Sequence, residues 1–381
     1  MHAVVVGGGI VGLASAYELA GRGVDVTLCE RGSLGGESTQ RSAGGIRTQF
    51  STPVNVDLTL RSLSVWDEFE ERFGVDIGRR RNGYLFLARD DETADDFREN
   101  VAMQNERGGE SYFLDPAEAA EHCPGLREEA FVAATYSPLD SFADPNLASQ
   151  GYAQALPDRG VDVRTKTRVT DVLVEDGRVA GVETDSGTVE ADYVVNAAGA
   201  WAGELAAMAG VDLPIVPRRR QAMVAAPESP VPEDVPLVVD LDSEVYFRPE
   251  REGAAIAGGH FGGADPAQDP DGYDGDADLD WAVDCLERLA GWTDYFGLDA
   301  GMKRGWAGLY AVTPDHHAIL EETVPGFVVA AGSSGHGFQH APATGKIVAD
   351  LVVDGETDRV DIDPLRSDRF EGEVRDERNV V

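Results

Sequence analysis

An apolar run and a glycine-rich turn open the chain and constrain its fold more than any other feature. Residues 3–6 read Ala-Val-Val-Val, and a G-x-G-x-x-G pattern follows at Gly7, Gly9 and Gly12. An apolar helical stretch comes next, and a second strand is predicted just before Glu30. Strand, glycine-rich turn, helix, strand and acidic residue form the dinucleotide-binding unit in this order. The sequence therefore predicts a bound dinucleotide rather than a glycine-rich turn alone.

Each member of this unit has a physical role toward a dinucleotide. Gly7 permits the tight turn, Gly9 lets the backbone approach a pyrophosphate, and Gly12 allows the helix to pack closely on the strand. The helix N-terminus offers unpaired N–H groups and a positive dipole end to the phosphates. Glu30 can accept hydrogen bonds from the ribose hydroxyls.

A long loop rich in glycine and serine follows this unit, over residues 31–45. A domain that binds only a nicotinamide dinucleotide normally returns to a third strand through a helix at this point. Small side chains instead suit close passage of the backbone along an extended ligand. The loop therefore favours a different dinucleotide.

Size and cysteine content bound the setting. The 381 residues can build two sizeable cores, and no apolar run is long enough to cross a bilayer. The N-terminal apolar stretch lacks the features of a signal peptide. Cys29, Cys123 and Cys285 show no C-x-x-C spacing, which argues against a disulfide framework or structural zinc. We expect a cytoplasmic protein with no membrane insertion and no metal site.

The charge is strongly negative. The chain has 69 acidic and 32 basic residues, for a formal net charge of −37, and its only lysines are Lys166, Lys303 and Lys346. Self-repulsion of this size is screened at molar salt. The acidic residues are spread along the chain, which argues against a disordered acidic tail. We therefore expect a high-salt cytoplasm, as in a halophilic microbe, and no binding to nucleic acid or anionic membranes.

The remaining sequence reads as mixed α/β without repeats. Helices are predicted over 59–73, 91–108, from 115, over 144–156, 276–290 and 341–353. Strands are predicted over 83–88, within 237–259 and over 327–331, with a β-meander over 161–174, 178–184 and 188–193. Residues 193–201 read as a buried strand that enters a small-residue turn.

Three segments resemble the flavoprotein family of D-amino acid oxidase, glycine oxidase and sarcosine oxidase. Residues 194–201 resemble the strand and turn beside FAD in that family, and residues 306–317 resemble its flavin-flanking segment. Residues 332–342 (GSSGHGFQHAP) are similar to a turn near the C-terminus of sarcosine oxidase β subunits. The resemblance covers most of the chain. It implies a Rossmann-like FAD-binding domain and a second α+β substrate domain on a mixed, largely antiparallel sheet.

The resemblance also implies domain boundaries and a set of cofactor contacts. The FAD-binding domain is expected over 1–75, 140–215 and 300–381, and the substrate domain over 76–139 and 216–299. FAD is expected to be non-covalent, because Gly308 and Arg41 stand where some relatives carry an attaching cysteine or histidine. The expected cofactor-binding residues are Gly7, Gly9, Ile10, Val11, Gly12, Glu30, Arg31, Ser38, Arg41, Ser42, Ala43, Gly44, Val169, Ala198, Gly199, Trp201, Gly308, Gly335, His336, Gly337, Phe338 and Gln339.

The chemistry implied by the resemblance is oxidation of an amine at the carbon beside a carboxylate, by hydride transfer to flavin. Arg47 matches the carboxylate-binding arginine of sarcosine oxidases, and its guanidinium suits bidentate bonds. The other expected site residues are Tyr246, His260, Tyr310, His336 and Gln339. Tyr310 replaces an arginine of D-amino acid oxidase and glycine oxidase, which favours a secondary amino acid such as sarcosine or proline.

The electron acceptor is dioxygen or another compound. Monomeric sarcosine oxidases carry an oxygen-activating lysine where this chain has Ile256, and Gln339 likewise replaces a lysine. Both differences favour a dehydrogenase over an oxidase. The sequence leaves the oligomeric state open, and a homo-oligomer is compatible with it.

Each of these residues also has a purely structural interpretation. Arg47 could contact a phosphate or form a surface ion pair, the two tyrosines could be core residues, and the histidines could be hydrogen-bonded polar residues. Adjacent His316 and His317 point to opposite faces of a strand, which disfavours a metal pair. The run 218–220 (Arg-Arg-Arg) suits salt bridges or an anionic substrate group. The acidic stretch 265–280 suits hydrated cations or a salt-adapted surface.

Two other functions remain open at this point. A 2-hydroxy-acid dehydrogenase on the same fold would need a base for the hydroxyl proton, and His260 or His336 could serve. A non-catalytic flavin-bearing assembly or partner protein would hold FAD that no small metabolite reduces.

Overall fold

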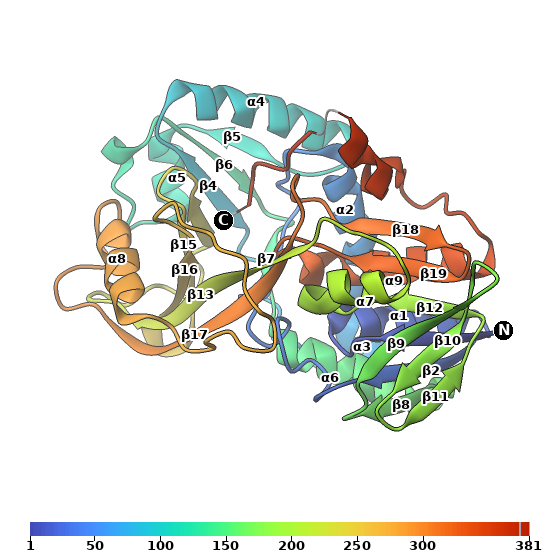
Figure 1. Ribbon diagram of the computed structural model, residues 1–381. Coiled ribbons are helices and arrows are strands. Elements are labelled where there is room, and N and C mark those ends of the chain that lie inside the picture. The colour runs from blue at the N-terminus through green and yellow to red at the C-terminus, as the bar shows by residue number, and fades with distance from the viewer. Residues whose placement is uncertain (373–374, 381) are drawn as a thin grey trace.

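The computed structural model describes residues 1–372 and 375–380 (Figure 1). A six-stranded sheet carries the N-terminal unit. Its order is β18 (Ile319–Val324), β19 (Phe327–Ala331), β12 (Tyr193–Asn196), β1 (His2–Val6), β2 (Asp25–Glu30) and β8 (Asp162–Thr165). Neighbouring strands are parallel except for the antiparallel pair of β18 and β19.

Both faces of this sheet are covered. Ala3 and Val5 of β1 share one core with helices, whereas Val4 and Val6 share another, because successive strand side chains point to opposite faces. The first core includes residues of α1 (Ile10–Gly21), α2 (Pro53–Asp67), α3 (Phe69–Phe73), α6 (Pro145–Ala155) and α9 (Gly337–Val353). The second includes residues of α7 (Ala202–Met208) and of the antiparallel strands β9 (Val169–Glu175), β10 (Arg178–Thr184) and β11 (Gly187–Glu190).

Two glycines let α1 lie close to its neighbours. A Cβ on Gly12 would lie 1.9 Å from the Gly7 carbonyl oxygen, and a Cβ on Gly345 of α9 would lie 2.7 Å from the Ala14 carbonyl. Both distances are far below van der Waals contact. Side chains at these positions would therefore push α1 away from the turn that precedes it and from α9.

A second, eight-stranded sheet is mixed and largely antiparallel. Its order is β17 (Gly301–Val312), β13 (Val216–Ala226), β16 (Ala255–Gly259), β15 (Val245–Pro249), β14 (Leu237–Asp240), β4 (Tyr84–Ala88), β6 (Ala133–Ser137) and β5 (Tyr112–Leu114). Only β14 and β4 pair in parallel among these described strands. Both the nucleotide-type sheet and this second sheet agree with the fold expected from the sequence.

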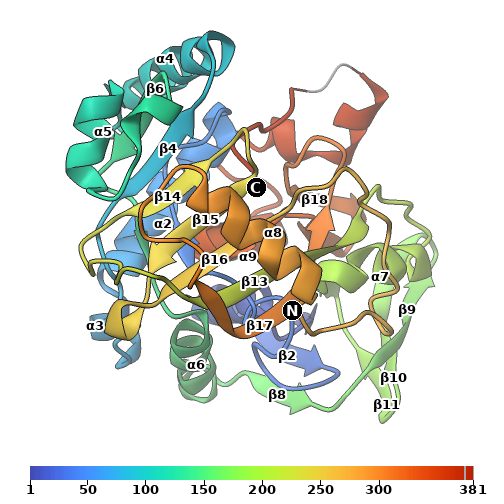
Figure 2. The same cartoon turned by 90° about the vertical axis from the view of Figure 1, so that its left-hand side faces the viewer.

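Helices also cover the second sheet. Leu85 and Leu87 of β4 share a core with α5 (Pro116–His122) and α8 (Leu279–Ala290), and Figure 2 shows α8 in front of β15 and β16. Tyr84 and Phe86 face the opposite core with α4 (Asp91–Glu106), which crosses the top of Figure 1.

Short elements complete the described chain. A two-stranded sheet joins β3 (Gly45–Ile46) to β7 (Ser141–Phe142). The 3₁₀ helices are η1 (Glu128–Ala130), η2 (Pro157–Arg159), η3 (Gly199–Trp201), η4 (Arg251–Gly253), η5 (Asp363–Leu365) and η6 (Ser367–Glu371). Within the described residues, none of the helices combines the length and apolar character needed to cross a membrane.

Several sequence predictions differ from the structure in detail. The strand predicted over 161–174 is wrong as one element: β8 pairs in parallel with β2, and only β9 joins the three-stranded sheet. Lys166 adopts φ 53° between the two strands and turns the chain. Helix α2 begins at Pro53 rather than residue 59, since proline suits the first helical turn. Helix α9 begins at Gly337 rather than residue 341.

The predicted division at 75, 140, 215 and 300 stays a prediction. The strand β17 pairs with β13 in the eight-stranded sheet, although its residues fall in the 300–381 segment assigned to the FAD-binding domain. The chain thus crosses between the two sheets along β17.

The close packing of α1 predicts a specific loss of stability. Gly345→Val should destabilise the fold by about 1–3 kcal/mol, because the new side chain meets the α1 backbone. Gly301→Val is the matched control, since no heavy atom lies within 4 Å of a Cβ built there. Thermal unfolding followed by circular dichroism should show a lower midpoint for the first variant alone. Equal midpoints for both variants would contradict this account of the α1–α9 packing.

Candidate active site

The turn before α1 forms one wall of a groove. Gly7 has φ 108°, and a Cβ there would lie 2.4 Å from the Ala197 carbonyl oxygen. At Gly9 the space is open, with only the Thr39 hydroxyl oxygen at 3.3 Å from a Cβ position. Gly7 and Gly12 therefore serve packing, whereas Gly9 leaves room for a ligand against the backbone.

Glu30 lies at the end of β2 and is held at the groove. Its carboxylate accepts hydrogen bonds from the Gly8 and Gly32 backbone N–H groups, at 2.7 and 2.6 Å. A carboxylate oxygen can accept more than one hydrogen bond, so Glu30 keeps acceptor capacity toward the groove that it lines.

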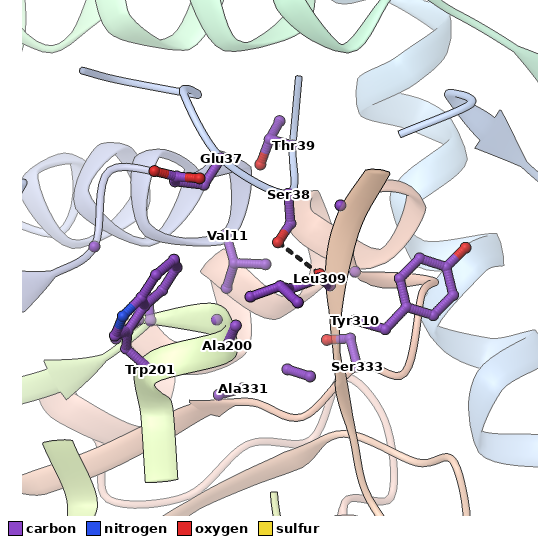
Figure 3. A pocket seen from close by; sticks show the side chains of 18 of the residues that line it. Val11, Glu37, Ser38, Thr39, Ala200, Trp201, Leu309, Tyr310, Ala331 and Ser333 are labelled. Atoms are coloured by element: carbon purple, nitrogen blue, oxygen red, sulfur yellow. Dashed lines mark hydrogen bonds between the residues drawn. The ribbon is translucent and has the colours of Figure 1, made fainter. Parts of the chain in front are cut away.

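The groove is lined by the glycine-rich turn, the loop after Glu30, the end of β17 and the turn before α9. Figure 3 shows Trp201 and Tyr310 on opposite sides, with Val11 and Leu309 between them. The Ser38 hydroxyl donates to the Leu309 carbonyl at 2.7 Å and ties the glycine- and serine-rich loop to β17. This elongated cradle with open glycine backbone fits a dinucleotide.

Most of the residues expected to bind the cofactor line this groove. They are Gly7, Gly9, Ile10, Val11, Glu30, Arg31, Ser38, Arg41, Ser42, Ala43, Val169, Ala198, Gly199, Trp201, Gly308, Gly335, Gly337 and Phe338. Gly12 and Gly44 lie behind the wall, where a Cβ would meet the carbonyl oxygens of Gly7 and Ala143. His336 and Gln339 line a second cavity instead.

The acidic stretch 265–280 contacts the edge of the groove, because Asp271 binds three side chains that line it. Its carboxylate accepts from Arg168 at 2.8 Å and from Trp201 Nε1 at 2.9 Å, and it pairs with Arg31. The Arg31 guanidinium also lies 3.6 Å from the centre of the Trp201 ring. Hydrogen bonds from Arg168, Trp201 and Arg31 lower the pKa of Asp271 to about 2, so this carboxylate is charged.

The same stretch pairs with the arginine run at 218–220. Arg220 binds Asp265 at 2.8 Å and Arg219 binds Asp278 at 2.8 Å. The structure thus favours the salt-bridge interpretation of this run. Arg220 lines the groove and Asp271 binds three of its lining side chains, whereas most of the acidic stretch is exposed.

A smaller cavity adjoins the groove, and Ser42, Ala43, Tyr246 and Tyr310 line both. Apolar side chains of the second sheet contribute to its lining, and so do several polar residues. The apolar lining residues include Phe86, Leu237, Val239 and Val380, and the polar ones include Arg47, Tyr84, His336, Gln339 and Asn379.

Arg47 is a buried cation in this cavity wall, with 8% of its surface exposed. The guanidinium lies 3.9 Å from the centre of the Phe50 ring and donates to the backbone carbonyls of Gln49 and Asn379. Burial lowers its pKa, and the Glu377 carboxylate opposes that shift. Arginine stays protonated in proteins, and these two bonds use two of its five N–H groups.

Gln339 fixes the Arg47 backbone. Its side-chain oxygen accepts the Arg47 N–H at 2.6 Å, and its carbonyl accepts the indole N–H of Trp66 at 2.9 Å. Tyr246 and Tyr310 are neutral phenols, since burial raises the pKa of each.

His336 lines the cavity, but both of its ring nitrogens face other groups. Nε2 lies 2.8 Å from the His316 carbonyl oxygen, and Nδ1 lies 3.4 Å from Nδ1 of His340. Burial, with a contribution from nearby Arg47, lowers the pKa of His336 to about 3. The imidazole is therefore neutral at ordinary pH and has no ring nitrogen directed at a substrate.

His260 stays a prediction as a site residue. It lines neither cavity within the described residues, and its Nε2 lies 3.7 Å from Asp265 in the acidic stretch. The residue directly follows β16 and is half-buried. A contact with substrate is not supported for His260.

Sequence reasoning missed Tyr84, Phe86, Asn379 and Val380 in the cavity wall. The first two lie in the apolar strand β4 and read as ordinary core residues. Asn379 and Val380 lie in a polar C-terminal stretch with no periodic pattern. No local sequence signal distinguishes either pair.

Comparisons with known proteins agree with this geometry. The family model described as DAO, FAD dependent oxidoreductase, matches residues 2–351. The Xenopus laevis FAD-dependent oxidoreductase domain-containing protein 1 is 30% identical over 99% of this chain and 84% of its own length. Human mitochondrial sarcosine dehydrogenase is 29% identical over 94% of this chain but only 40% of its own length. The chain thus spans less than half of that relative.

Two solved structures are similar over nearly their whole length. The L-proline dehydrogenase from P. horikoshii superposes with a TM-score of 0.89 at 34% identity, covering 98% of this chain and 99% of that one. The glycine oxidase from Geobacillus kaustophilus gives 0.83 at 28% identity, covering 96% and 97%. With the dinucleotide groove and the family match together, the chain belongs to the DAO family of FAD-dependent oxidoreductases, as an enzyme of the amino acid dehydrogenase and oxidase type that uses FAD.

Proposed function

We propose that this enzyme oxidises a small secondary amino acid, with sarcosine and proline as first candidates, to an imine that water then hydrolyses. The buried Arg47 guanidinium in the wall of a small cavity beside the cofactor groove carries this proposal. FAD, when bound, supplies the hydride acceptor. The carbon beside the amine loses a hydride, the nitrogen loses its remaining proton, and a C=N bond forms.

Arg47 is proposed to bind the substrate carboxylate. Two of its N–H groups donate to the Gln49 and Asn379 carbonyls, which orients the guanidinium plane. The remaining N–H groups can take a carboxylate, and the apolar surroundings strengthen such a charge-assisted bond. Phe86, Leu237 and Val239 contribute apolar surface that limits water around the reacting carbon.

The neutral amine is proposed to be the reacting form. Tyr246 and Tyr310 line both cavities as neutral phenols and can hydrogen-bond the amine. His336 has both ring nitrogens directed at His316 and His340, so it is poorly suited to take a proton from a substrate. A 2-hydroxy acid, which needs such a base, is therefore the weaker candidate.

The acceptor after FAD is proposed to be a compound other than dioxygen, and FAD to be held without a covalent bond. Ile256 lies buried in β16, and the Gln339 side chain is used by the Arg47 backbone, so neither position offers a cation. Gly308 and Arg41 line the groove at the positions where some relatives attach flavin. Similarity to an L-proline dehydrogenase supports this choice.

The setting is proposed to be a salt-rich cytoplasm. The −37 net charge gives the folded chain strong self-repulsion at low ionic strength. Mobile ions shorten the range of that repulsion, from about 10 Å at 0.1 M salt to about 3 Å at 1 M.

Replacing Arg47 should weaken substrate use selectively. Arg47→Lys keeps the charge but loses the planar fork, so kcat/KM for the preferred amino acid should fall by about 10–100-fold. Anaerobic flavin bleaching by sarcosine, L-proline, D-proline, glycine, D-alanine and 2-hydroxyglutarate measures this effect. Arg79→Lys is the control, because Arg79 is a half-buried arginine that pairs with Asp67 and lines neither cavity among the described residues. An unchanged KM in Arg47→Lys with normal FAD content would refute the assignment.

The pH dependence should follow the substrate amine. The protonated amine cannot release a hydride, so the rate of flavin reduction should rise with pH through the amine's own titration. His336, with a pKa of about 3, stays neutral and should add no step near the ordinary histidine value of about 6.5. Sarcosine and a fluorinated N-alkylglycine of lower amine pKa provide the comparison. A midpoint that stays fixed while the substrate amine changes would indicate an enzyme base instead.

Salt should stabilise the protein in proportion to its charge. The thermal midpoint should rise between about 0.1 M and about 1 M KCl as repulsion is screened. A variant with Glu70→Gln, Glu71→Gln and Glu99→Gln, all exposed acids, should gain less from the same salt. A midpoint independent of KCl, or an equal gain in both proteins, would count against the salt-rich setting.

A further inference from the structure

Residues 375–380, here named the strap, reach the small cavity near the C-terminal end of the sequence. In Figure 1 the red trace after η6 leads toward β4. Asn379 and Val380 line the cavity together with Arg47, and Asn379 is buried. The strap therefore contributes directly to the proposed substrate site, although it lies more than 300 residues from Arg47 in sequence.

Glu377 anchors the strap inside the protein, with 1% of its surface exposed. Its carboxylate accepts from the Ser51 N–H and hydroxyl at 2.8 Å each and from the Thr52 hydroxyl at 2.6 Å. It also accepts from Asn55 at 3.1 Å and from the Asn379 N–H at 3.1 Å. Burying a carboxylate is costly unless it is fully hydrogen-bonded, so these donors form a built binding site for the strap.

Backbone contacts reinforce this anchor. The Glu377 N–H donates to the Asp315 carbonyl at 3.0 Å, and the Arg378 N–H donates to the Ser51 hydroxyl at 2.8 Å. The strap is thereby held on both sides of Glu377.

Asn379 connects the strap to Arg47. The Asn379 carbonyl accepts from Arg47 Nη2, and its side-chain amide donates to the Gln49 carbonyl at 3.2 Å. The same Gln49 carbonyl accepts from Arg47 Nη1. Two neutral acceptors thus orient the guanidinium, and the Glu377 carboxylate of the same strap favours its charged form.

Val380 supplies apolar surface beside this oriented cation. It is half-buried and lines the cavity with Phe86, Leu237 and Val239. Its side chain takes up room that an N-alkyl group or ring of a substrate would otherwise use.

We propose that the strap sets substrate size and carboxylate binding at this site: Glu377 anchors it, Asn379 positions Arg47, and Val380 limits the room beside the amine. Glu377 and Asn379 are positioning residues, and Val380 is a specificity-determining residue. This inference rests on the proposed oxidation of a small amino acid and assigns the part of the chain that selects among such substrates.

Val380→Ala tests the wall. Removing two methyl groups should raise the ratio of kcat/KM for N-propylglycine to that for sarcosine by about 10-fold, within the range known for one methylene in an apolar pocket. Val380→Phe should lower the same ratio. Val174→Ala is the matched control, because Val174 is an exposed valine of β9. An unchanged ratio in both Val380 variants would overturn the role of Val380.

Glu377→Gln tests the anchor. An amide cannot accept all of the bonds that the carboxylate accepts, so the strap should loosen and KM should rise about 10-fold with kcat changed less. Glu377→Asp should restore part of the loss. A merely structural role would lower FAD content or the thermal midpoint without moving the N-propylglycine ratio, and that result would overturn the positioning role.

A binding measurement separates failure of the strap from failure of the proposed reaction. Pyrrole-2-carboxylate and indole-2-carboxylate can be titrated against the visible flavin band of the FAD-loaded protein, without turnover. If no amine reduces the flavin, the proposed reaction fails. The strap proposal then depends on these titrations: Val380→Ala should favour the larger carboxylate by about 10-fold. No binding of either probe, or an unchanged preference, would overturn the strap proposal as well.

Discussion

Close backbone contact at Gly12, against the β1 turn, and at Gly345, between α9 and α1, sets the position of α1, and much of the site follows from that position. A Cβ at either residue would lie within 2.7 Å of a neighbouring carbonyl group. Because α1 lies against both the β1 turn and α9, the N-termini of these two helices meet the same groove, where Gly9 and Gly337 are both lining residues. Two partial positive helix ends therefore face one ligand space.

Two buried carboxylates hold the segment that follows Arg47 at the small cavity. Asp140 is fully buried and accepts from the Thr48 N–H, the Thr48 hydroxyl at 2.7 Å and the Gln49 amide at 3.0 Å. Burial raises the pKa of Asp140 to about 6. Glu377 binds the next residues of the same segment, Ser51 and Thr52. The segment after Arg47 is thus held by two carboxylates: Asp140 binds residues 48 and 49, and Glu377 binds residues 51 and 52. Both help to position Arg47 before any ligand binds.

The sequence was most informative where structure depends on neighbouring residues. The G-x-G-x-x-G turn, the strand that ends at Glu30 and the start of α5 after Asp115 could be predicted because they depend on local backbone geometry. The pairing of β8 with β2 could not, since the pattern of a strand does not identify its partner. A resemblance gives a position in the chain but not the direction of a side chain, so it could not show that His260 lies beside Asp265.

The parts of the site contributed by distant segments were the least predictable. Glu377 sits in a stretch of charged residues that reads as an exposed tail, and only the donors on Ser51, Thr52 and Asn55 explain its burial. The stretch 265–280 likewise reads as acidic surface, although Asp271 binds three groove-lining side chains. Long-range hydrogen bonds of this kind leave no periodic mark in the sequence.

The Asp271 contacts have a consequence for the exchange of cofactor. Arg31, Arg168 and Trp201 come from three separate segments of the nucleotide-binding half, yet they share one carboxylate from the connection between β16 and α8. Loss of that single carboxylate removes one partner from each of the three side chains, while Arg31 keeps its contacts with Glu37 and the Trp201 ring. We expect salt to weaken these partly exposed ion pairs, and thereby to shorten the time that bound cofactor stays in the groove.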